Sequence, residues 1–224
     1  MTRPPTAERP LLGQTVLVVE DSRFSCEALR MICQRSGARI RRADSLKSAA
    51  RHLRTYRPGI ILIDVGLPDG SGLDLVRDLA ASEVRIGVII AMSGDDTNAD
   101  PALQSGADAF IAKPITSISA FQQAIIAELP KDARPTALRP VSTDEIVPDR
   151  IAYRDDLVLA ADLLANLTDA ETIAYVTSFL IGLGNSADDP DLANIASKAE
   201  SASPPGIRNL RAAVDQRLAT LVTV

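Results

Sequence analysis

The sequence has few aromatic residues, one histidine and two cysteines. Its 224 residues include four Phe, three Tyr and no Trp. Hydrophobic residues still make up 46% of the chain, which is normal for a globular protein and too high for a disordered one. The cores must therefore be built from Ala, Val, Ile and Leu.

The two cysteines, Cys26 and Cys33, are seven residues apart. On one helix this spacing separates them by about 10 Å, which is beyond the reach of a disulfide. We therefore expect two reduced core thiols in a cytoplasmic protein.

Long apolar runs and an excess of positive charge are also missing. The apolar runs Val16–Val19, Ile60–Ile63 and Val88–Met92 have the length of strands, whereas a spanning helix needs about 20 apolar residues. Prolines stand near the N-terminus where an export signal would need an apolar helix, so residues 1–14 are expected to be a disordered tail. The net charge of -5 gives no bulk attraction to nucleic acid or to an anionic membrane.

Short apolar runs alternate with helical patterns from Thr15 to Leu129. The expected strands are Thr15–Glu20, Arg39–Ala43, Gly59–Asp64, Ile86–Met92 and Ala109–Ala112. The expected helices are Ser22–Ser36, one capped by Asp44 and running to Tyr56, one from the turn at 66–72 to about Ser82, a short one ending at Gly106, and Thr116–Leu129. This alternation predicts an α/β fold with a five-stranded, doubly wound parallel sheet of the flavodoxin-like type over residues 15–129.

The composition and the hydrophobic pattern of the sequence change after residue 129. Four prolines among polar residues indicate a linker over residues 130–150. Strand patterns are missing from residues 151–224, which predict a small all-α helical bundle. Its expected helices are Tyr153–Leu167, one opened by a capping box at Thr168–Glu171 and ended by Gly182 and Gly184, one opened by Asp189-Pro190, and one opened by Ser203-Pro204.

Charged and polar side chains fall at the ends of the predicted strands. Glu20 and Asp21 end the first strand, Asp64 ends the third, Ser93 ends the fourth, and Lys113 ends the fifth. The carboxyl ends of parallel strands meet at one edge, so three carboxylates should converge there and repel one another without a cation. Oxygen ligands with water completing the shell suit Mg²⁺, which is the cofactor we expect.

Three motifs together resemble the receiver domain of bacterial two-component response regulators. They are Val-Leu-Val-Val-Glu-Asp at 16–21, Ile-Asp-Val-Gly-Leu-Pro-Asp-Gly-Ser-Gly at 63–72, and Phe-Ile-Ala-Lys-Pro at 110–114. Each motif alone is weak, but all three occur in order and at the family's spacing. The resemblance covers residues 15–129, about half of the chain.

The resemblance implies a role for each residue of the acidic edge. Asp64 would be the phosphoacceptor and one of the metal ligands. Asp21 would bind Mg²⁺ directly, and Glu20 would act mainly through water. Gly66, two residues after the acceptor, would offer its backbone carbonyl to the metal.

The resemblance also implies how the phosphoryl group would be held and sensed. Ser93 would donate a hydrogen bond to the phosphoryl group, and Lys113 would pair with it. Phe110 would be the switch aromatic that turns inward when the hydroxyl moves. Pro114 stands where the family often has a cis peptide bond.

One segment departs from the family pattern. The stretch from Ser93 to Gly106 is about two residues shorter than usual, and Asp100-Pro101 falls where the fourth helix should be running. Because proline is tolerated only in the first turn of a helix, this helix should begin near Asp100 and be very short. In many members of the family, the face formed by this helix, the fifth strand and the fifth helix transmits the signal. The resemblance does not extend to that route here.

The resemblance implies a response regulator of a phosphorelay. Its phosphoryl donor would be a sensor histidine kinase or a histidine-phosphotransfer protein. The domain would catalyse only its own phosphorylation and dephosphorylation, so we do not expect an enzyme acting on a separate substrate.

The bundle leaves three kinds of output open. Residues 150–224 contain six Lys and Arg against ten Asp and Glu, a net charge of -4 that opposes DNA binding. The same stretch contains no His, no Cys and no glycine-rich phosphate loop, which argues against an enzyme. A module that binds a downstream protein or forms a homodimer is favoured, including one built like a histidine-phosphotransfer bundle without its histidine.

The chain's only histidine is His52, which lies outside the bundle, so an active phosphotransfer bundle is excluded. Outside the bundle, Arg35, Arg39, Arg41 and Arg42 form a basic cluster. We interpret this cluster as a solvated face rather than as a docking patch for an acidic partner.

Overall fold

The fold is described from a computed structural model, which covers residues 4–135, 149–167, 169–199 and 203–222. The chain divides into two compact units. The first unit comprises Met1–Asp21 and Ala28–Val147, and the second comprises Ser22–Glu27 and Pro148–Val224.

The first unit contains a five-stranded parallel sheet. Its strands are β1 (Thr15–Val19), β2 (Arg39–Ala43), β3 (Ile60–Asp64), β6 (Val88–Ser93) and β7 (Ala109–Ala112). They are ordered β2-β1-β3-β6-β7, and every neighbouring pair is parallel. Every residue of β3 and β6 is buried, as expected for central strands that are covered on both faces. The predicted doubly wound sheet is confirmed.

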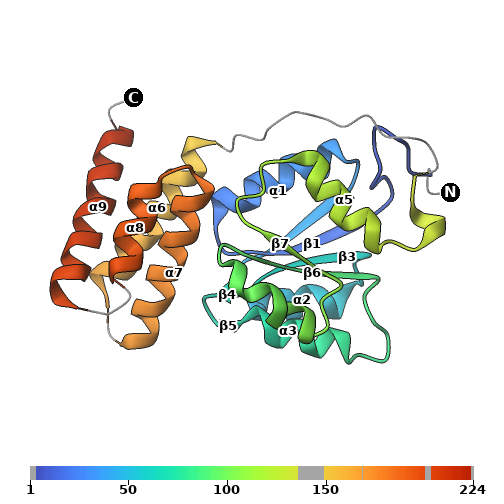
Figure 1. The fold of residues 1–224 in the computed structure, drawn as a ribbon, viewed down its shortest axis with the longest axis horizontal. Coiled ribbons are helices and arrows are strands. Elements are labelled where there is room, and N and C mark those ends of the chain that lie inside the picture. Colours follow the sequence, from blue (N-terminus) through green and yellow to red (C-terminus); the bar gives the residue numbers. More distant parts are fainter. Residues whose placement is uncertain (1–3, 136–148, 168, 200–202, 223–224) are drawn as a thin grey trace. The chain divides into compact units, whose positions relative to one another are not determined.

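Helices cover both faces of this sheet (Figure 1). α1 (Arg23–Arg35) and α5 (Ile118–Glu128) lie on one face. α2 (Leu46–Thr55), α3 (Gly72–Ala80) and the short α4 (Ala99–Gln104) lie on the other. The remaining elements of the unit are the hairpin β4 (Gly66–Leu67) and β5 (Gly70–Ser71) and the 3₁₀ turns η1 (Asp96–Asn98) and η2 (Lys131–Ala133). The short fourth helix agrees with the sequence prediction, since Pro101 lies in its first turn.

Three details of the first unit differ from the sequence prediction. The cap of α2 is Ser45 and not Asp44, because the Ser45 side chain is the one that accepts the hydrogen bond from the Ser48 N–H. The hairpin β4–β5 was not predicted, because its strands have only two residues each. Part of the expected N-terminal tail is ordered, since Leu11 is fully buried and its N–H donates to the Ser36 carbonyl.

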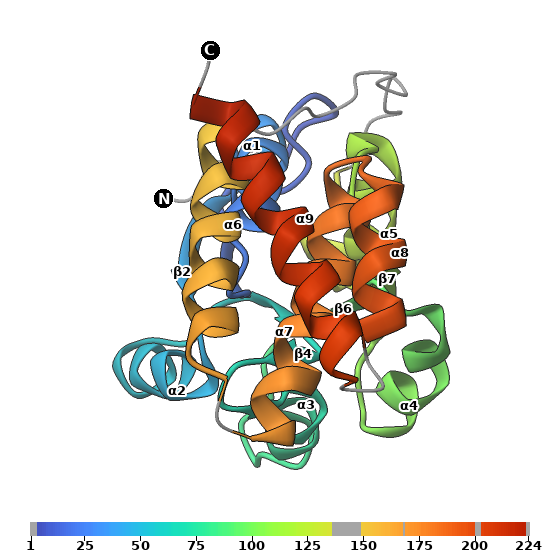
Figure 2. The same ribbon diagram turned by 90° about the vertical axis from the view of Figure 1, so that its left-hand side faces the viewer.

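The second unit contains a bundle of four helices, drawn from yellow to red in Figure 2. The helices are α6 (Arg150–Ala165), α7 (Ala170–Ser186), α8 (Pro190–Ala199) and α9 (Pro204–Val222). Contacts close a ring from α6 to α7, α8, α9 and back to α6. Leu157, Leu180, Leu192 and Val214 are fully buried in its core. The predicted helical bundle is therefore present; residues 136–148 of the predicted linker lie outside the described residues.

The predicted end of α7 is wrong. Gly182 and Gly184 lie inside the helix, which continues to Ser186. A Cβ atom on Gly184 would lie 2.7 Å from the Ala193 nitrogen and 2.9 Å from the Asp189 carbonyl oxygen, so this glycine is required by the close approach of α8. At the other end of α7, Asp169 is the residue whose side chain caps the helix, while Thr168 lies outside the described residues.

A partly buried polar cluster ties three helices of the second unit together. The Asp189 carboxylate accepts hydrogen bonds from Arg217 Nε at 2.5 Å and Nη2 at 2.7 Å, and from the Tyr153 hydroxyl at 2.8 Å. The hydrogen bonds from Arg217 lower the pKa of Asp189 to about 2, against the effect of its burial. The carboxylate is therefore charged at neutral pH and bridges α6 to α9.

The two glycines of α7 make a matched test of this packing. Gly184→Ala should destabilise the second unit by about 1–3 kcal/mol, because its methyl group has no room against α8. Gly182→Ala should be neutral or stabilising by up to about 1 kcal/mol, because nothing lies within 4 Å of its Cβ position and Ala favours a helix. Urea denaturation of both variants measures the difference; equal effects would contradict the close approach of α7 and α8.

Candidate functional site

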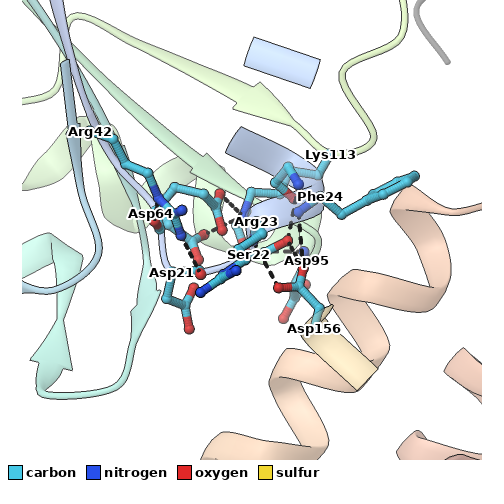
Figure 3. Close-up of polar contacts among 12 residues, drawn as sticks. Asp21, Ser22, Arg23, Phe24, Arg42, Asp64, Asp95, Lys113 and Asp156 are labelled. Carbon is cyan, nitrogen blue, oxygen red and sulfur yellow. Dashed lines mark hydrogen bonds and ion pairs between the residues drawn. The ribbon is translucent and has the colours of Figure 1, made fainter. Parts of the chain in front are cut away.

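The carboxyl edge of the sheet brings the predicted site residues together. Glu20 and Asp21 follow β1, Asp64 ends β3, Ser93 ends β6 and Lys113 follows β7. Figure 3 shows the side chains of Asp21, Asp64 and Lys113 gathered at this edge. The sequence prediction that strand ends would bring these residues together agrees with the structure.

Three carboxylates form a compact acidic cluster. Glu20, Asp21 and Asp64 each offer an oxygen atom, and these atoms all lie within 4.8 Å of one another. All three residues are buried, with exposed fractions of 1%, 8% and 7%. Clustered carboxylate oxygens fit a hard divalent cation such as Mg²⁺.

Lys113 supplies the positive charge within the cluster. Its Nζ lies 2.6 Å from Glu20 Oε2 and 2.9 Å from Asp64 Oδ1, and its side chain is only 8% exposed. The Lys113–Pro114 peptide bond is cis, in agreement with the expectation for Pro114. With the carboxylates ionised, three negative charges and one positive charge leave a net charge of -2, which one divalent cation would balance.

Burial changes the proton affinity of both partners of the Lys113–Asp64 ion pair. Burial raises the pKa of Asp64 to about 7; Lys113 opposes the rise, Glu20 adds to it, and the backbone N–H of Gly66 opposes it as well. Burial alone would lower the pKa of Lys113, but the carboxylates of Asp64 and Glu20 outweigh it, so this pKa is raised. Lys113 therefore stays charged, and a further cation near Asp64 would favour its ionised, nucleophilic form.

The remaining predicted residues lie near the same edge. Ser93 is buried, and its Oγ accepts a hydrogen bond from the Asp95 N–H at 3.1 Å. Phe110 lies in β7, half-buried against the core between the sheet and the helices α2, α3 and α4. Gly66 lies in β4, where it pairs with Ser71.

Arg42 has a role at this site that the sequence interpretation missed. Its Nη2 donates to the Asp21 carbonyl oxygen at 2.8 Å, and its Nε lies 3.4 Å from the Glu20 carbonyl oxygen (Figure 3). Arg42 is exposed, in agreement with the interpretation of the arginine cluster as a solvated face, but its guanidinium also bonds to the backbone at the acidic edge. The sequence pattern does not indicate this role, because a hydrogen bond from a side chain to a distant backbone carbonyl requires no particular sequence motif.

Gly72 is a second residue that sequence reasoning passed over. A Cβ atom at this position would lie 1.9 Å from the Asp64 carbonyl oxygen. Only glycine therefore allows the first turn of α3 to pack against the backbone of Asp64. Asp69, in the same loop, accepts hydrogen bonds from the Leu46 and Lys47 N–H groups and so fixes the loop to the start of α2.

Comparisons with known proteins match the first half of the chain to one protein family. Residues 16–125 match the family model of the response regulator receiver domain. The chain is 35% identical over 115 residues to the virulence transcriptional regulatory protein PhoP of Salmonella typhimurium. This match covers 50% of this chain and 51% of PhoP. It is 29% identical over 126 residues to the KDP operon transcriptional regulatory protein KdpE of Escherichia coli, and this match covers 56% of each chain. The chain thus spans about half the length of the curated relatives it matches.

Solved structures give a similar match. The signal receiver domain of a histidine kinase from Syntrophus aciditrophicus is 26% identical with a TM-score of 0.49, and the match covers 58% of this chain and all of that domain. No helix in the described part of the chain has the length and apolar character needed to cross a membrane.

Proposed function

Because residues 16–125 form a response regulator receiver domain, we propose that this chain accepts a phosphoryl group on Asp64. The donor is a sensor histidine kinase or a histidine-phosphotransfer protein of a phosphorelay. The observation that carries the proposal is the buried cluster of Glu20, Asp21 and Asp64 with Lys113 bound to two of its carboxylates.

The proposed reaction is a displacement at phosphorus. A carboxylate oxygen of Asp64 attacks the phosphorus atom of a phosphohistidine, the P–N bond breaks, and the donor imidazole leaves and takes up a proton. Lys113 and the Ser93 hydroxyl hold the phosphoryl oxygens. Mg²⁺ held by Glu20, Asp21, Asp64 and the Gly66 carbonyl would neutralise the charge on those oxygens.

Further assignments belong to the same proposal. Phe110 is the switch aromatic that responds to movement of Ser93. The chain acts in the cytoplasm and, apart from its own phosphorylation and dephosphorylation, is not an enzyme. We also propose the division into a tail at 1–14, a receiver at 15–129, a linker at 130–150 and an output bundle at 151–224, with part of the tail packed on the receiver.

The second unit is proposed to pass the signal on by binding a downstream protein. Two relatives are named as transcriptional regulators, but the match covers only about half of each, so their output does not carry over to this chain. Residues 150–224 carry a net charge of -4, from six basic and ten acidic residues, which opposes contact with phosphates. A constitutive homodimerisation module is the alternative output.

A short segment supplies the route by which phosphorylation would affect the second unit. Ser22–Glu27 belong to that unit and follow Asp21, the proposed metal ligand, directly in the chain. Within the unit, the buried Asp156 carboxylate accepts hydrogen bonds from Ser22 Oγ at 2.7 Å, the Arg23 N–H at 2.9 Å and the Phe24 N–H at 3.0 Å (Figure 3). A shift of the backbone at Asp21 would therefore change how Asp156 is bound.

Labelling by a small phosphodonor tests the acceptor. Asp64→Asn should abolish labelling by acetyl phosphate, because the nucleophilic carboxylate is lost. Asp74→Asn is the matched control, since its carboxylate is 66% exposed on α3 and should not contribute. Full labelling of Asp64→Asn, measured by intact-protein mass, would sink the assignment.

Magnesium titration tests the metal site. Asp21→Ala should weaken Mg²⁺ binding at least tenfold, because one of the three clustered carboxylates is lost. Asp74→Asn again serves as the control and should bind Mg²⁺ as the unaltered protein does. An unchanged affinity in Asp21→Ala, measured by calorimetry, would exclude Asp21 as a ligand.

Hydrogen exchange tests the coupling between site and output. Beryllofluoride with Mg²⁺ should change the protection of Ser22–Glu27 and of α6 together, because Asp156 joins them. If protection changes only around Asp64 and Ser93, the second unit is not a phosphorylation-controlled output. It would then be the constitutive dimerisation module.

A further inference from the structure

The Ser93 hydroxyl is held from one side by two hydrogen-bond donors. Its Oγ accepts a hydrogen bond from the Asp95 N–H at 3.1 Å and another from the Asn98 side-chain amide, with Nδ2 at 3.1 Å. A serine hydroxyl has two acceptor lone pairs and one proton. With both lone pairs engaged, Ser93 has its proton left to offer to another group.

The side chain of Asn98 stands in an unusual arrangement. Asn98 is the N-cap residue of α4, and an asparagine at this position usually accepts a hydrogen bond from the first turn of the helix. Its side chain makes no such bond. Instead it turns back toward Ser93, so the sequence uses a good capping residue for another purpose.

A second contact fixes the orientation of the Asn98 side-chain amide. Nδ2 lies 3.3 Å from the Asp95 carbonyl oxygen as well as 3.1 Å from Ser93 Oγ. If the amide were rotated by 180°, its oxygen would face that carbonyl oxygen, which is repulsive. The amide nitrogen must therefore be the atom that points at Ser93.

The short segment after β6 places Asn98 where it can make these contacts. Asp95 caps the turn η1, and its Oδ1 accepts hydrogen bonds from the Thr97 N–H at 2.9 Å and the Thr97 hydroxyl at 2.7 Å. Asn98 ends that turn and begins α4. Because η1 turns the chain soon after β6, the side chain of Asn98, five residues after Ser93, can reach the Ser93 hydroxyl.

We propose that Asn98 is a positioning residue that sets the direction of the Ser93 hydroxyl. Its amide occupies a lone pair of Oγ and so keeps the hydroxyl proton available for a phosphoryl oxygen on Asp64. The inference rests on the proposed function of Asp64, but it adds a residue that the family resemblance did not assign. Asn98 acts only through Ser93 and does not touch the phosphoryl group.

The test replaces the donor of residue 98 by an acceptor. In Asn98→Asp, the new carboxylate should accept the Ser93 proton, so the hydroxyl no longer donates to the phosphoryl group. Asp is also a good N-cap residue, so α4 should be preserved. Beryllofluoride, titrated at saturating Mg²⁺, should bind about tenfold more weakly, which corresponds to one lost hydrogen bond. Asn98→Ala, in which the hydroxyl can rotate freely, should show a smaller loss.

A double-mutant cycle separates positioning from simple charge repulsion. In a Ser93→Ala background, Asn98→Asp should cause no further loss of beryllofluoride affinity, because the hydroxyl it acts on is absent. An equal loss in both backgrounds would show that the added charge alone is responsible and would overturn the proposal, as would an unchanged affinity in Asn98→Asp. The affinity for Mg²⁺ alone should stay the same in all variants. If the unaltered protein failed to bind beryllofluoride, the proposed function would fail before the role of Asn98 arose.

Discussion

The site depends on a crowding of like charges that the parallel sheet imposes. β1 and β3 are neighbours, so the carboxylates that follow or end them must lie close together. Three carboxylates in a buried place repel one another. Burial, together with the charge of Glu20, raises the pKa of Asp64 to about 7 although Lys113 opposes the rise. Lys113 relieves part of this repulsion by bonding to Glu20 and Asp64. The remaining negative charge is of the size that one divalent cation would balance.

The site residues that stand at the ends of apolar runs could be predicted from the sequence. Glu20, Asp64, Ser93 and Lys113 were predictable because each lies at the end of an apolar run, and parallel strands bring such ends to one edge. Their individual roles came from a resemblance and stay proposals.

The residues that sequence reasoning missed act through contacts between distant parts of the chain. Arg42 bonds to backbone carbonyls of residues that follow the neighbouring strand β1, and Gly72 makes room for the Asp64 carbonyl oxygen. Gly184 was taken for a helix end because glycine breaks isolated helices, whereas here it lets two helices approach closely. Asn98 was not singled out in the sequence, and only the structure shows its amide turned toward Ser93.

The account rests most of all on Asp64 as the group that forms the acyl phosphate. Borohydride reduces an acyl phosphate to an alcohol but leaves a free carboxylate unchanged, so the phosphorylated aspartate is converted to homoserine. After treatment with acetyl phosphate and Mg²⁺, then borohydride, peptide sequencing by mass spectrometry should find homoserine at position 64. Homoserine at Asp21 or at any other aspartate, with position 64 unchanged, would contradict the account.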